Sequence, residues 1–205
     1  MTKNEIKKLI KRRHQLVGVF KDFNSDLKEG ESTEVLESIA KNTRNDLGDI
    51  VRTIDEQLLT FVKEDPVGLW LLQIKGMTPD IAAGLLAYFD ITGKECAAQF
   101  IKYAGADNYN NAHNNSVREI LNRLENNFKF EKDSIYDNFN AAKFAELSAS
   151  MEPLTAKIRA DRATRKLFIS HLFEEMYREE HNGELPRRYE NADCTFIAPE
   201  VPYTK

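Results

Sequence analysis

The chain has 205 residues, of which 41% are hydrophobic and 30% charged, and its formal net charge is −4 at pH 7. This length suits one sizeable domain or a compact domain with an extension, and the composition excludes wholesale disorder. The acidic balance argues against a protein that coats nucleic acid over its whole surface. No apolar run approaches the roughly 20 residues that cross a bilayer, the N-terminus lacks the apolar core of a signal peptide, and the two cysteines lie far apart. We therefore expect a cytoplasmic protein that does not bind a membrane.

Residues 1–64 predict a long helical hairpin. Apolar residues recur at three-to-four spacing over residues 4–28, and a second apolar stripe runs from 35 to 62, after a break at 28–32. Two amphipathic helices joined by a short turn pair in an antiparallel way. The stripes are long enough to recruit a second copy, which predicts a coiled-coil dimer and hence a homo-oligomer. An intramolecular hairpin packed on the rest of the chain explains the pattern equally well.

Residues 65–186 predict a compact multi-helix domain that begins with two short helices. Asp65 is the expected cap of a helix over 66–74, which carries the only tryptophan. A tight turn follows at 75–77, and Thr78 is the expected cap of the next helix, with Pro79 at its first position. This order of helix, glycine turn and helix is the pattern of a helix-hairpin-helix.

Further helices are expected along the rest of the domain. Thr92 and Glu95 form one candidate capping box, opening a helix over 95–103 that Gly105 ends, and Ser116 and Glu119 form another. The later helices are expected over 116–128, 136–148 and 155–181. Residues 106–115 predict a polar loop and residues 187–205 an extended tail. The expected fold is all-α, because neither a sheet nor an internal repeat is visible.

The turn of a helix-hairpin-helix offers backbone N–H groups to a phosphate. A glycine lets the backbone approach the anion closely, and the first N–H groups of the following helix are unpaired within it. Here Gly76, Met77 and Thr78 would supply those donors, with Lys75 beside them. The commonest form of the motif has proline before the glycine and a second glycine two residues later, and those places hold Lys75 and Thr78 here. A tight turn that only buries its apolar neighbours remains the alternative.

Basic residues gather in two segments. Residues 1–28 hold eight lysines and arginines, and a second cluster consists of Lys157, Arg159, Arg162, Arg165 and Lys166. Clusters of this kind follow a phosphate backbone in nucleic-acid-binding proteins. Solvated helix faces are the simpler explanation. If the clusters do bind nucleic acid, the second cluster and residues 75–78 are the candidate DNA-binding residues.

No pattern in the chain nominates catalysis, a metal or a cofactor. Ser116 is explained as a helix-capping residue, and the carboxylate pairs at 174–175 and 179–180 as a solvated helix face. The histidines show no spacing typical of metal ligands; they are His14, His113, His171 and His181. We expect neither catalytic residues nor a small-molecule substrate.

Several longer segments match a known pattern. Ile74, Gly76 and Pro79 are followed by the small-residue segment 82–91 and then by Tyr-Ala-Gly at 103–105. This order resembles the C-terminal domain of the DEDD-type insertion-sequence (Piv-like) transposases. Residues 114–118, 162–172 and 185–186 are similar to a stand-alone branch of that group found in phages and mobile elements. The resemblance covers about residues 66–203 and implies an all-helical DNA-binding domain.

The chain also departs from that group. The full transposases begin with a ribonuclease-H-like catalytic domain, whereas residues 1–64 resemble at most the coiled coil that joins their domains. Ala106 and Asp107 replace the residues that precede the family's serine nucleophile, and the basic loop of the stand-alone branch is replaced at 108–113. The resemblance therefore implies a non-catalytic DNA-binding protein derived from a transposase. Two alternatives are an interaction protein that kept the fold, and an accessory recombinase subunit whose partner supplies the nuclease.

Overall fold

A computed structural model of the chain describes residues 1–29, 34–106, 114–184, 198–199 and 201–202. The described residues form helices, turns and loops without a strand, which confirms the expected all-α fold. The helices are α1 (Lys3–Glu29), α2 (Glu34–Lys63), α3 (Pro66–Leu71), α4 (Pro79–Tyr88), α5 (Ala97–Tyr103), α6 (Asn115–Phe130), α7 (Ile135–Ser148) and α8 (Pro153–Glu180). None of the helices in these ranges is long and apolar enough to cross a membrane.

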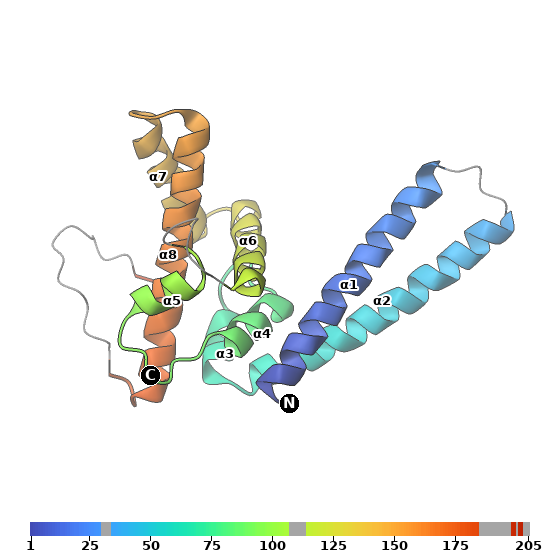
Figure 1. Cartoon of the computed structure of the whole chain (residues 1–205), viewed down its shortest axis with the longest axis horizontal. Helices are drawn as coiled ribbons and strands as arrows, with labels where there is room; N and C mark the ends of the chain where they lie inside the picture. Colours follow the sequence, from blue (N-terminus) through green and yellow to red (C-terminus); the bar gives the residue numbers. More distant parts are fainter. Residues whose placement is uncertain (30–33, 107–113, 185–197, 200, 203–205) are drawn as a thin grey trace.

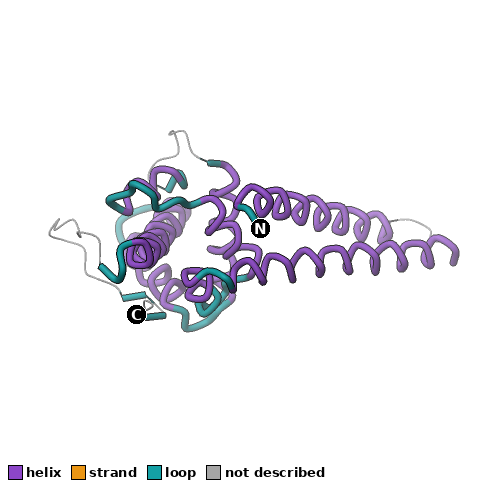
Figure 2. The backbone as a smooth tube through the Cα atoms, turned by 90° about the horizontal axis from the view of Figure 1, so that it is seen from below, coloured by secondary structure: helices purple, strands orange, loops and turns teal. Residues whose placement is uncertain are grey.

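Helices α1 and α2 lie side by side and project from the rest of the molecule as an arm (Figures 1 and 2). At the base of the arm Ile6 and Ile10 of α1 and Leu58 of α2 are fully or almost fully buried. Farther out, Val19 of α1 is 54% exposed and Ile50 of α2 is 49% exposed. Apolar side chains are therefore fully buried at the base of the arm, whereas those farther out are half-buried, such as Leu16 and Val17, or exposed.

Helix α4 lies at the centre of the molecule and contacts α1, α2 and α6. All its residues from Asp80 to Ala87 are buried. A Cβ on Gly84 would lie 2.6 Å from Cδ1 of Ile120 in α6, so the glycine permits the close approach of these two helices. The small residues of α4 thus allow three neighbours to pack directly on its backbone.

Aromatic side chains hold α5, α6, α7 and α8 together. Phe128 of α6 stacks on Tyr136 of α7 with ring centroids 4.5 Å apart, and Phe168 of α8 meets both rings edge-on. Phe100 of α5 packs edge-on against Phe173 of α8 at 5.2 Å. Helices α7 and α8 form a second hairpin, which rises from the body at the top of Figure 1.

The structure corrects both predicted capping boxes. Helix α5 begins after Cys96, and the Thr92 hydroxyl donates to Asp90 Oδ1 at 2.9 Å, so Thr92 caps no helix. Helix α6 is capped by Asn114, whose Oδ1 accepts from the N–H of Ser116 at 3.0 Å and of Val117 at 3.3 Å. Asparagine and serine cap helices about equally well. The residue that caps is the one whose backbone is extended just before the first helical residue, and here that residue is Asn114.

Other predicted boundaries shift or stay untested. Helix α3 ends at Leu71, three residues before the predicted end, because residues 73 and 74 bond to carbonyls three positions back and tighten the chain into a turn. Gly105 has a φ of +68°, as suits the residue that ends α5. Most of the predicted polar loop and of the predicted tail lies outside the described residues. The division into 1–64, 65–186 and 187–205 stays a prediction.

Candidate nucleic-acid interface

A tight turn joins α3 to α4. Asp65 caps α3 by accepting the Gly68 N–H at 3.1 Å. The Met77 N–H donates to the Ile74 carbonyl at 3.1 Å, and the φ of Gly76 is +80°. Thr78 is extended and Pro79 begins α4. The two helices and their turn therefore follow one another in the predicted order.

Gly76 is needed for the fold irrespective of any ligand. Its positive φ strains other residues, and a Cβ there would lie 3.3 Å from Cβ of Asn127 in α6 and from Cγ of Glu131, which follows α6. The Asn127 side chain donates to the Gly76 carbonyl at 2.9 Å. One side of the turn is thus packed against α6, and the glycine is explained without a phosphate.

Two backbone donors of the turn remain open. The Met77 N–H is used within the turn, but the N–H groups of Gly76 and Thr78 meet no acceptor in the described part of the chain. The Thr78 hydroxyl donates to Asp80 Oδ1 at 2.7 Å and caps no N–H of α4. Thr78 is half-buried and Lys75 exposed. An anion approaching from solvent would therefore meet fewer donors than the three that the sequence predicts.

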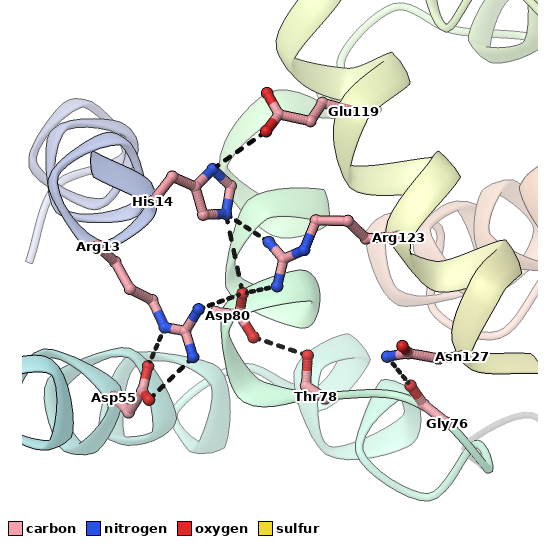
Figure 3. A network of polar contacts seen from close by, with 9 residues as sticks. All are labelled: Arg13, His14, Asp55, Gly76, Thr78, Asp80, Glu119, Arg123 and Asn127. Carbon is pink, nitrogen blue, oxygen red and sulfur yellow. Dashed lines mark hydrogen bonds and ion pairs between the residues drawn. The ribbon is translucent and has the colours of Figure 1, made fainter. Parts of the chain in front are cut away.

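The first turn of α4 carries a buried carboxylate, that of Asp80, which is 3% exposed (Figure 3). Arg123 of α6 donates to its Oδ2, and Nη1 of Arg13 in α1 lies 3.3 Å from the same oxygen. Arg13 also bonds both carboxylate oxygens of Asp55 in α2, with Nη2–Oδ2 at 3.1 Å. This Asp80 clamp, made of Arg13, Asp55, Asp80 and Arg123, joins the base of the arm to α4 and α6.

The clamp favours one protonation state for each group. Burial favours the neutral acid, but the charge of Arg123 and the hydrogen bond from Thr78 outweigh it, so the pKa of Asp80 lies below its ordinary value. Burial and the neighbouring Arg123 both lower the pKa of His14, whose Nε2 contacts the Arg123 guanidinium. At neutral pH an ionised Asp80 therefore faces two arginines, and the positive end of the α4 dipole already has a carboxylate beside it.

The basic cluster of α8 is divided between solvent and the interior. Lys157 and Arg159 are exposed, whereas Arg162 and Lys166 are half-buried. Arg165 bonds Glu125 of α6, with Nη2–Oε2 at 2.7 Å and Nε–Oε2 at 3.0 Å. Arg165 is thus part of the contact between α6 and α8, and its charge is balanced there.

The structure does not bring the predicted residues into one surface. The turn touches α6 at Asn127, whereas Arg165 touches it at Glu125. Two residues along a helix correspond to about 200° of rotation, so the turn and Arg165 approach α6 from opposite sides. Residues 75–78 and the α8 cluster are therefore separate candidates.

A further basic face lies on α1. Lys8, Lys11 and Arg12 are exposed, and none of them forms an ion pair within the described ranges. Lys7 lies over the ring of Tyr88 at the end of α4, 4.8 Å from its centroid. The sequence shows this cluster, but only the structure indicates which of its members face solvent.

Comparisons with known proteins assign no family. No model of a protein family matches the chain, and no curated protein matches it either. Within the ranges that the structure describes, no three His, Cys, Asp or Glu side chains gather as metal ligands would. The transposase resemblance thus rests on the motifs alone.

Proposed function

We propose that the protein is a non-catalytic DNA-binding protein that contacts the phosphate backbone at the turn between α3 and α4. One observation carries the proposal: the N–H groups of Gly76 and Thr78 are open at a turn whose exposed neighbour is Lys75. Backbone donors and a lysine recognise phosphate irrespective of base sequence. The exposed part of the α8 cluster, Lys157 and Arg159, would add salt-sensitive contacts on a separate surface.

The test measures binding of the purified chain to duplex, branched and single-stranded DNA across a salt series. Lys75→Glu should weaken binding to all sequences alike and reduce the slope of log K against log salt by about one. Lys41→Glu is the matched control, because Lys41 is an exposed lysine of α2 and is not part of the turn. Equal losses in the two variants would show a general charge effect and remove the turn from the site.

Gly76→Val is unsuited to this test. The strained φ and the contacts with Asn127 mean that valine would disturb the fold together with any phosphate contact. Lys75→Glu changes an exposed side chain and leaves the backbone donors in place. Unfolding curves of the variants establish that binding is compared between equally folded proteins.

A specific observation favours a second function, assembly with another copy through the arm. The outer arm exposes Val19 and Ile50, and Leu16 and Val17 of α1 are only half-buried. In a pair of helices each helix covers one side of the apolar stripe of the other. A second arm packed alongside would bury apolar side chains that the first arm leaves exposed. We propose an antiparallel pairing of two arms into a four-helix bundle.

Light scattering during size-exclusion chromatography tests this assembly. A dimer mass that falls to a monomer mass in Ile50→Lys is the expected result, because a buried lysine without a partner opposes the interface. Arg52→Ala is the control, since Arg52 is exposed on the same helix and makes only a surface pair with Asp49. A monomer mass for the unchanged chain at every concentration would refute the pairing. In that case the DNA proposal would concern a monomer.

A further inference from the structure

The only tryptophan of the chain contacts the C-terminal segment. Trp70 lies in α3 and is 0% exposed. Its Nε1–H donates to the carbonyl oxygen of Val201 at 3.1 Å, a contact between residues 131 positions apart. A buried indole N–H requires an acceptor. The tail residue thus supplies a polar partner inside the core.

The described residues around Val201 form neither helix nor strand. Val201 is half-buried and packs against the core, Pro199 is half-buried, and Pro202 is exposed. Val201 itself lies in a bend, and Ala198, Pro199 and Pro202 belong to no helix or strand. Pro199 and Pro202 have no backbone N–H to satisfy. A proline ring fixes its φ before the segment docks, so such a segment loses less entropy on binding.

We infer that the surface at Trp70 is a peptide-docking site for a proline-flanked apolar segment, and that its occupant is the C-terminal segment of this chain around Val201, of which residues 198–199 and 201–202 are described. These residues act as a strap over α3. Helix α3 has six residues, and a helix this short depends on tertiary contacts for its stability. The strap therefore steadies α3 and can be replaced by a free peptide of the same sequence.

Trp70 reports on the strap directly, because no other tryptophan contributes to the fluorescence of the chain. In the full chain, Val201→Asp opposes the apolar contact while keeping the backbone carbonyl. The emission maximum should move to longer wavelength, and acrylamide quenching should rise as water reaches the indole. Val201→Ala should give a smaller change in the same direction. Ala198→Ser is the control, since Ala198 is exposed, and should change both readings less than either variant.

Replacement by a free peptide tests the docking site itself. A synthetic peptide of residues 195–205, added to the Val201→Asp chain, should return the emission maximum toward that of the unchanged protein. A segment tethered to the same chain has an effective concentration of the order of millimolar, so the peptide is titrated to that range. The same peptide carrying aspartate at 201 should have no effect.

Two results would overturn the inference. One is an emission maximum and a quenching constant that are the same in both Val201 variants as in the unchanged chain. The other is a failure of the unmodified peptide to shift the emission of the Val201→Asp chain at the highest concentration. Circular dichroism is recorded for each variant, and if Val201→Asp loses helix, Val201→Ala takes its place in both experiments. Neither experiment involves DNA, so the inference stands apart from the proposed function.

Discussion

Replacing Asp80 with asparagine should weaken the attachment of the arm more than any comparable surface change. The side chain keeps its shape but loses the charge that faces Arg13 and Arg123. Arg13 would keep its pair with Asp55, whereas Arg123 would lose the carboxylate with which it pairs. The carboxylate is almost fully buried, so water cannot take over its role.

The expected loss follows from the burial of the pair. Removing one partner of a buried ion pair costs about 3–5 kcal/mol, because the other charge is left without compensation. The side chains of Arg13 and Arg123 are 18% and 32% exposed, which places Asp80→Asn near the lower limit, at about 3 kcal/mol. With a urea m-value of about 2 kcal/mol/M, the unfolding midpoint should fall by roughly 1.5 M.

Urea unfolding followed by circular dichroism at pH 7 measures this loss. Asp49→Asn is the matched control, because Asp49 pairs with Arg52 at 3.1 Å on the surface and surface pairs contribute about 0–1 kcal/mol. If Asp80→Asn shifts the midpoint no more than Asp49→Asn does, the clamp does not hold the arm. The difference in stability between Asp80→Asn and the unchanged chain should also vanish in acid. The pKa of Asp80 in the folded chain lies below its ordinary value of 3.8, so the carboxylate stabilises the fold above pH 3.8. This stabilisation disappears as the pH falls through the folded pKa.

Three more substitutions have defined outcomes. The pKa of His14 in the folded chain lies below its ordinary value of 6.5, so the unfolded chain binds more protons just below that pH. The stability of the unchanged chain should therefore fall as the pH is lowered from 6.5, and that of His14→Gln should fall less. Urea midpoints measured across this pH range test the difference. Gly68→Ala should cost about 3 kcal/mol or prevent folding, because its Cβ would lie 2.1 Å from the Val62 carbonyl oxygen; an unchanged melting temperature would refute this. Asn114→Ala should cost about 1 kcal/mol and Ser116→Ala less than about 0.5 kcal/mol in the same unfolding assay, and the reverse order would restore the predicted cap.

Periodic patterns predicted the helices well, because they depend on neighbouring residues. The stripe over 35–62 and the expected range 155–181 mark α2 and α8 to within a few residues of their ends. Capping is also local, yet the choice between Asn114 and Ser116 depends on which residue is extended, and composition does not determine that. With two residue types that cap equally well only two positions apart, the sequence predicted the wrong cap for α6.

Contacts between segments far apart in the chain could not be predicted from the sequence. Asp80 is recognisable as a favourable residue near a helix start, but nothing in the chain links it to Arg13 or Arg123. The contact of Trp70 with Val201 has no local signal either. Arg165 is different, because it lies on the same helical face as the buried Phe168 and Leu172, at spacings of three and seven. That spacing predicts that Arg165 faces the interior, so the sequence alone could have separated Arg165 from the exposed members of the basic cluster.

The start of α4 is where the two explanations of the hairpin can be separated. Asp80 behind the turn serves the fold, since it pairs with Arg13 of α1 and Arg123 of α6, whereas Lys75 is exposed and lies outside this clamp. A negative charge near the turn opposes a second anion, and the two clamp arginines reduce that opposition. If Lys75→Glu weakens DNA binding and leaves the urea midpoint unchanged, the turn contacts phosphate. If DNA binding changes only in variants whose stability also changes, the glycine turn is explained by its packing on α6 alone. The pairing of two arms is then the proposal that remains for the function of the protein.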